Sequence, residues 1–158
     1  TLQMVESGPV AHDDASLEAI RHAFEIELGG RDFYAAAAAA TGDDDLRDMF
    51  GRLAAMEREH LDTLVQRYHV APPSDAGDGL HRGVLQAGGH RDPTDPFDLV
   101  EMALALERRA EQYFRERIGT ASGAAQELYR ELAAEEAEHI DLLTTELAAM
   151  RANRRALL

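Results

Sequence analysis

The chain has 158 residues, of which 30 are acidic and 16 basic, so its formal net charge is −14. This negative charge disfavours nucleic acid or an anionic membrane as a partner, because phosphates would be repelled. Cysteine is absent, which excludes disulfides, thiolate metal sites and iron–sulfur ligation within this sequence. No apolar run approaches the ~20 residues of a membrane span, and we expect a cytoplasmic protein with one folded domain.

Residues 1–13 lack helical periodicity and contain Gly8 and Pro9, which predicts an extended arm or the remnant of a linker. Residues 14–158 are predicted to form one helical domain. Because the chain starts at Thr1 rather than at methionine, we expect either a processed product or a piece of a longer polypeptide.

Four segments then show apolar residues at helical spacing, separated by capping residues and helix breakers. Asp13, Asp14 and Ser16 are candidate caps for the first segment. Asp95 followed by Pro96 is the start signal of the third, because proline suits the first turn of a helix. The predicted helices span about residues 16–40, 45–68, 96–118 and 124–151.

The connections between these helices are short, long and short. Short loops make neighbouring helices antiparallel, whereas residues 70–95, which are rich in proline and glycine, are long enough to cross the length of a bundle. The third helix would then run parallel to the second. The predicted fold is an all-α, ferritin-like four-helix bundle with one long crossover between its second and third helices.

The two halves of the chain resemble each other. The segment LAAMEREHLD at 53–62 matches LAAEEAEHID at 132–141 at a constant offset. In the preceding helices, Glu27 and Glu107 are each followed at the same steps by one small and two aromatic residues. A helical hairpin therefore occurs twice, which predicts an internal twofold repeat.

The repeated glutamates and histidines fall on the apolar stripe of each helix. Glu57 and His60 are three residues apart and share a helix face, as do Glu136 and His139. Buried carboxylates are costly unless they are paired or bind metal, and two divalent cations would neutralise four of them. One glutamate from each of two helices and Glu-x-x-His from each of the other two is the pattern of di-iron and di-manganese bundles. The predicted metal ligands, which are also the candidate catalytic residues, are Glu27, Glu57, His60, Glu107, Glu136 and His139.

Two sequence motifs occur in the first hairpin, Glu27-x-x-Gly30-x-x-Phe33-Tyr34 and Phe50-x-x-Leu53-Ala54-x-x-Glu57-x-x-His60. They resemble the rubrerythrin (erythrin) branch of the ferritin-like superfamily, and the resemblance covers about residues 16–150. It implies a non-haem site for two iron ions, held by the six residues above, and reduction of hydrogen peroxide. Manganese and zinc are alternatives, since glutamate and imidazole accept each of these metals.

The sequence also departs from that family. Many rubrerythrins carry a four-cysteine rubredoxin-like module; without one, electrons would come from a separate rubredoxin-like donor protein. Ala110 stands where the peroxidases often have a further glutamate, and we expect the neighbouring Glu111 to face solvent. We also expect a homodimer.

Two alternative functions stay open. One is a bacterioferritin-like protein that oxidises Fe(II) with dioxygen or peroxide and stores iron, although Arg58 stands where those proteins have the haem-binding methionine. The other is a non-catalytic metal-binding module of a larger polypeptide.

Other polar residues lie near the predicted ligands in the sequence, and for each of them a structural role competes with a role at the metal site. Tyr34 lies two turns from Glu27, and a tyrosine packed in the core is favoured over one that hydrogen-bonds at the metal site. Glu135 could compete with Glu136 as a ligand, but the repeat favours Glu136, and Glu135 is expected in solvent. The remaining histidines show no paired spacing, and those of the crossover loop, His81 and His90, are expected to be exposed.

Overall fold

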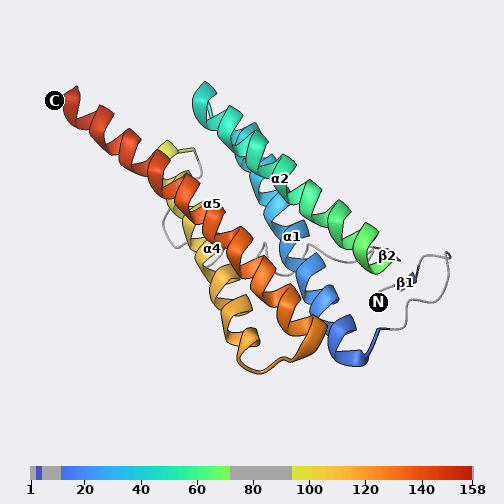
Figure 1. The fold of residues 1–158 in the computed structure, drawn as a ribbon. Coiled ribbons are helices and arrows are strands. Elements are labelled where there is room, and N and C mark those ends of the chain that lie inside the picture. Colours follow the sequence, from blue (N-terminus) through green and yellow to red (C-terminus); the bar gives the residue numbers. More distant parts are fainter. Residues whose placement is uncertain (1–2, 5–11, 72–93, 158) are drawn as a thin grey trace.

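The computed structural model describes residues 3–4, 12–71 and 94–157 and consists almost entirely of four long helices (Figure 1). Most of the predicted crossover loop, with its two histidines, and most of the predicted N-terminal arm lie outside the described residues. The helices are α1 (Asp14–Ala40), α2 (Asp44–Tyr68), α4 (Pro96–Ile118) and α5 (Gly123–Ala156).

Aspartates begin three of the helices. The side chain of Asp13 accepts a hydrogen bond from the backbone N–H of Ser16, and Asp43 and Asp95 do the same for the first turns of α2 and α4. Pro96 occupies the first turn of α4, as predicted. These caps satisfy backbone donors that the first turn of a helix leaves free. The predicted starts are confirmed to within two residues, but α5 continues past the predicted end at residue 151 to Ala156.

A two-residue strand pair, which the sequence did not predict, lies at the end of α2. The left-handed residue His69 (φ 53°) ends α2, and β2 (Val70–Ala71) then pairs antiparallel with β1 (Gln3–Met4). The His12 side chain hydrogen-bonds through Nε2 to the carbonyl oxygen of Tyr68 at 2.8 Å. Two parts of the predicted N-terminal arm therefore lie against the end of α2.

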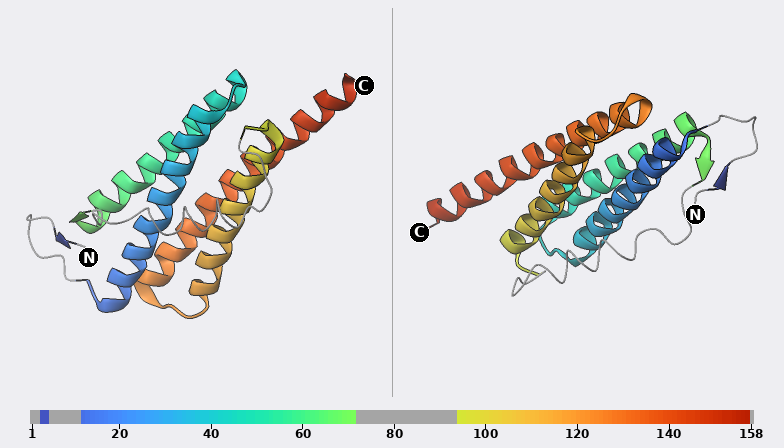
Figure 2. Two further views of the ribbon diagram at one scale, coloured as in Figure 1. Left: turned by 180° about the vertical axis from the view of Figure 1, so that it is seen from behind. Right: turned by 90° about the horizontal axis from the view of Figure 1, so that it is seen from below.

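The helices form two antiparallel hairpins, α1 with α2 and α4 with α5, which pack against each other (Figures 1 and 2). An all-α four-helix bundle is thus confirmed. Among the described residues, no helix combines the length and the apolar character that crossing a membrane would require.

The apolar core is divided into two clusters. On α2, Leu53 belongs to one cluster and Leu61 to the other; on α5, Leu143 and Leu132 are divided in the same way. The layer between the clusters is polar, and on each helix it is occupied by a predicted metal ligand. The packing therefore isolates the polar layer from solvent on both sides along the bundle axis.

Candidate metal centre

All six predicted ligands lie in the polar layer. The four glutamates are 1–2% exposed, His139 is fully buried, and His60 is partly buried. Each helix contributes to the layer: α1 carries Glu27, α4 carries Glu107, and α2 and α5 each carry a Glu-x-x-His pair. A spacing of three residues is almost one helical turn, which places both members of each pair on the inner face of the helix.

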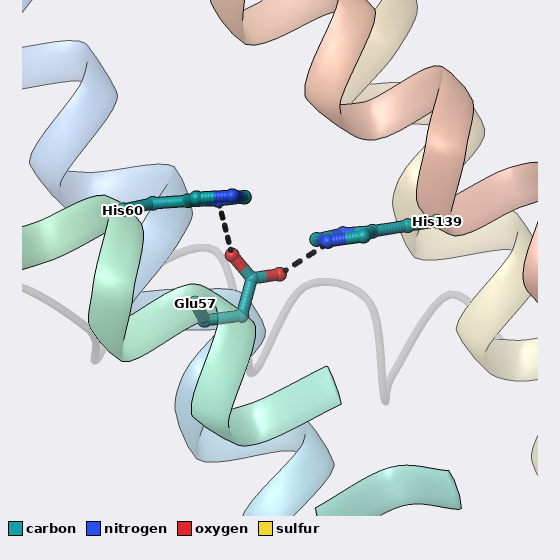
Figure 3. Close-up of side chains that lie close together, drawn as sticks. All are labelled: Glu57, His60 and His139. Carbon is teal, nitrogen blue, oxygen red and sulfur yellow. Dashed lines mark ion pairs between the residues drawn. The ribbon is translucent and has the colours of Figure 1, made fainter. Parts of the chain in front are cut away.

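Glu57 lies between the two histidines, one from each hairpin (Figure 3). Its Oε2 is 3.5 Å from Nδ1 of His60, and its Oε1 is 3.4 Å from Nδ1 of His139. The two imidazole rings are nearly parallel, with centroids 5.5 Å apart and planes at 11°. One carboxylate therefore faces both halves of the site.

Each histidine also approaches the glutamates of its own hairpin. Nδ1 of His60 is 3.1 Å from Oε2 of Glu27. Nδ1 of His139 is 3.3 Å from Oε1 of Glu107 and 3.6 Å from Oε2 of Glu136. The six side chains thus form one connected group rather than separate ion pairs.

Several buried polar atoms of this layer lack a hydrogen-bond partner. Within the described part of the chain, one oxygen each of Glu27, Glu57 and Glu136 and both ring nitrogens of His139 are in this state. An unpaired buried polar atom costs about 1–3 kcal/mol, and more when the group is charged. These atoms are the oxygen and imidazole nitrogen donors that iron, manganese and zinc accept. The residues present therefore fit a bound metal.

The electrostatics of the layer also oppose four ionised glutamates. Burial, with the nearby charge of Glu27, raises the pKa of Glu57 well above its ordinary value. Burial, with the nearby charge of Glu107, does the same to the pKa of Glu136. Burial also acts to raise the pKa of Glu107, but its interactions with Glu136, His139 and Tyr34 outweigh burial and lower that pKa. Without cations, the layer therefore favours a mixture of neutral and ionised carboxyl groups.

Gly30 makes room for Glu57. A Cβ atom at position 30 would lie 2.5 Å from Oε1 of Glu57 and 3.0 Å from its carboxyl carbon. The glycine of the first motif therefore has a steric role, because it lets α1 approach the carboxylate that faces both histidines.

Tyr34 has both of the roles considered for it, because it packs in the core, as favoured, and also hydrogen-bonds within the polar layer. Its side chain is fully buried, and its hydroxyl donates a short hydrogen bond to Oε1 of Glu107. Burial and the charge of Glu107 raise the pKa of Tyr34 well above its ordinary value. The hydroxyl therefore stays protonated and can hold Glu107 in place.

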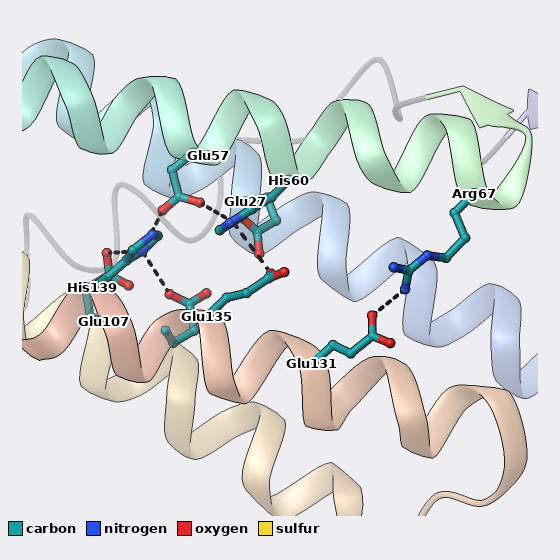
Figure 4. A network of polar contacts seen from close by, with 9 residues as sticks. Glu27, Glu57, His60, Arg67, Glu107, Glu131, Glu135 and His139 are labelled. Atoms are coloured by element: carbon teal, nitrogen blue, oxygen red, sulfur yellow. Dashed lines mark hydrogen bonds and ion pairs between the residues drawn. The ribbon is translucent and has the colours of Figure 1, made fainter.

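Glu135 is more buried than the prediction of a solvent-facing side chain would have it. Its side chain is only 36% exposed, and its Oε2 lies 3.6 Å from Nδ1 of His60, across the gap between α5 and α2 (Figure 4). The repeat gave no signal, since the matching residue in α2 is Met56. The spacing of four residues to His139 was an available signal, because it places Glu135 on the side of α5 that carries that ligand. Glu111, which was also expected to face solvent, has a side chain only 21% exposed and pairs with Arg115 on its own helix at 2.7 Å.

Potential ligand atoms come together in three overlapping groups. In each group, atoms from all members lie within 4.8 Å of one another. The layer can therefore hold a metal ion. The groups are Glu57–His60–His139, Glu57–Glu107–Glu136–His139 and Glu27–His60–Glu135.

Comparison with protein-family models, with curated proteins and with solved structures finds no match for this chain.

Proposed function

We propose that this protein is a ferritin-like, rubrerythrin-type oxidoreductase that binds two iron ions and reduces hydrogen peroxide or oxidises Fe(II) with dioxygen or peroxide. The observation that carries the proposal is the buried layer of four glutamates and two histidines, in which five polar atoms have no hydrogen-bond partner in the described part of the chain. Bound cations would satisfy these atoms and neutralise the carboxylates.

The ferritin-like topology and the twofold repeat are part of the proposal. The directions of α2 and α4 in Figure 1 support a crossover, because both helices run from the same end of the bundle to the other. The contacts of His60 with Glu27 and of His139 with Glu107 support the repeat, since each histidine approaches the glutamate of the preceding helix in its own hairpin.

The six residues would divide the work of holding the metals. His60 and His139 would each supply one ring nitrogen, and Glu57, which faces both histidines, would supply its carboxylate. Glu27, Glu107 and Glu136 supply further oxygens, and the Tyr34 hydroxyl orients Glu107. Manganese or zinc would fit the same donors, and supply in the cell would choose among them.

Two bound Fe(II) ions would supply the two electrons that, with two protons, convert hydrogen peroxide to two molecules of water. The surroundings of the site suit a small reactant. The pocket beside His60 and Glu135 has a volume of only about 20 Å³, which is room for roughly one water molecule. Peroxide and dioxygen are of that size, whereas a larger organic substrate is not.

The branch between peroxidase and ferroxidase chemistry depends on a residue outside the layer. Ala110 cannot supply the further carboxylate that rubrerythrin-type peroxidases often carry, which favours the oxidation of Fe(II) as the second candidate. For repeated turnover as a peroxidase, we propose a separate rubredoxin-like electron donor, and we propose a homodimer as the assembly.

Stopped-flow measurements on the Fe(II)-loaded protein test this function. Peroxidase activity predicts rapid oxidation of the protein's iron by peroxide and slow oxidation by dioxygen. Rapid oxidation of added Fe(II) by dioxygen, with a mineral product, would establish the ferroxidase instead. Protein that binds iron but is oxidised slowly by both would contradict an oxidoreductase and leave a metal-binding module.

A further inference from the structure

Glu135 belongs to a group of three potential metal donors at the outer edge of the buried site, together with Glu27 and His60. Glu27, His60 and Glu135 bring one ligand atom each to within 4.8 Å of one another. Their exposure increases outward, because the side chain of Glu27 is fully buried, that of His60 is 18% exposed and that of Glu135 is 36% exposed. This group therefore reaches from the buried layer to solvent.

The innermost member of this group, Glu27, has a carboxylate oxygen that is free to coordinate a metal ion. Oε1 of Glu27 is buried and has no hydrogen-bond partner among the described residues, while Oε2 of the same carboxylate contacts His60. Glu135 is thus more than one more acid on an acidic surface. Its nearest partner, His60, connects it to a buried carboxylate with free coordinating capacity.

A narrow pocket lies beside this group, between α2 and α5. It is lined by His60 and Glu135 at its inner part and by Thr63, Arg67, Leu128 and Glu131 farther along the helices. Its volume of about 20 Å³ fits one water molecule or one partly dehydrated ion. The lining also includes Leu64 and Leu132, and Arg67 offsets the charge of Glu131. The donors that suit a metal cation are therefore the Glu135 carboxylate and the His60 nitrogen at the inner part of the pocket.

An ion pair lies along this pocket. Arg67 of α2 donates to Glu131 of α5, and both side chains are about half exposed (Figure 4). Exposed ion pairs contribute little to stability. Here the pairing places a positive charge close to a cation route and partly neutralises it with Glu131.

We propose that Glu135 and His60 form an outer cation-binding position through which divalent metal ions pass from solvent, between α2 and α5, to the buried site. The inference rests on the proposed metal site and adds its route of loading. Glu135 captures the ion, and the His60 nitrogen and the free oxygen of Glu27 are the next donors inward. Arg67 slows entry by its charge.

Cobalt(II) uptake tests the route, with visible absorption reporting the rate and the amount bound at equilibrium. Glu135→Gln removes the outer carboxylate at nearly constant shape and is expected to slow uptake roughly tenfold, because local charge sets the rate of ion capture. The final amount should stay at about two ions per chain. Arg67→Gln should accelerate uptake.

Glu138→Gln is the matched control, because it removes the same charge from an exposed position on the same helix. Equal uptake rates for Glu135→Gln and Glu138→Gln would overturn the route. Loss of a bound ion in Glu135→Gln would also overturn it, by making Glu135 a ligand of the inner site. If the unaltered protein bound no cobalt, the proposed metal site itself would fail together with the route.

Discussion

At the scale of single residues, the close approach of Gly30 to Glu57 offers a substitution that should weaken metal binding without preventing folding. Alanine in place of glycine inside a helix normally stabilises a protein by about 0.5–1 kcal/mol. At position 30, the new Cβ would meet the Glu57 carboxylate at 2.5 Å and displace it. We therefore expect Gly30→Ala to fold but to bind metal roughly 10- to 100-fold more weakly, a loss typical when the support of a ligand is disturbed.

Gly51→Ala provides the comparison for this substitution. Gly51 lies at an exposed position of α2, and a Cβ there would meet nothing within 4 Å. Calorimetric titration with metal should give unchanged affinity for this variant, and denaturant unfolding should show the helix-propensity gain. Unchanged metal affinity in Gly30→Ala would contradict the steric role of Gly30.

The raised pKa values of Glu57 and Glu136 predict an unusual pH dependence of the metal-free protein. Both groups favour the neutral form in the folded state, so the folded protein holds protons that the unfolded chain releases above the ordinary carboxyl pKa of 4.5. The free energy of unfolding should therefore fall as pH rises from about 4.5 towards neutrality. His60 acts in the same direction, because Glu27 and Glu135 outweigh its burial and raise its pKa above 6.5.

Denaturant unfolding at a series of pH values, in the presence of a chelator, measures this dependence. Replacing Glu57 and Glu136 together by glutamine should flatten it and stabilise the metal-free protein at neutral pH. A slope that is identical in the variant would mean that these two carboxyl groups ionise alike in the folded and unfolded states.

At the scale of helices, local sequence signals accounted for the starts of the elements. Asp95 accepts hydrogen bonds from the backbone N–H groups of Phe97 and Asp98, which makes it the cap that its position before Pro96 predicts. Asp95→Ala should lower the free energy of unfolding by about 1 kcal/mol, whereas Asp95→Asn should retain most of it. Chemical denaturation of the three proteins measures the difference, and equal losses in both variants would argue against a capping role.

Other features of the elements could not be predicted from local signals. The last turns of α5 lack a stop signal in the sequence, and the helix continues to Ala156 although residues 151–157 are all exposed. The β1–β2 pair joins residues that are far apart in the chain and too few to show periodicity. The partial burial of Glu135 could not be predicted for a related reason, since its contact with His60 is made with another helix.

The positions of the six predicted ligands, in contrast, could be predicted because helical geometry fixes them. Periodicity assigned each glutamate and histidine to an inner helix face, and the duplicated hairpin aligned the two halves. The structure brings all six into one buried layer. Distances across the layer, the hydrogen bond from Tyr34 and the asymmetry of exposure between the two histidines required the packed bundle.

At the scale of the whole molecule, the site joins two hairpins that each pack mainly within themselves. α1 packs chiefly on α2, and α4 chiefly on α5, while Glu57 contacts His139 across the interface. Metal ions held by residues of both hairpins would stabilise the bundle by mass action, because the unfolded chain has no assembled site. Function and cohesion of the fold would then depend on the same layer.

The most direct test is anaerobic titration of the chelator-treated protein with Fe(II), with bound metal quantified after removal of free ions. The account predicts saturation at about two ions per chain, and loss of that binding when Glu57 and Glu136 are both replaced by glutamine. Saturation below one ion per chain, or equal binding by the double variant, would contradict a di-metal centre in the buried layer.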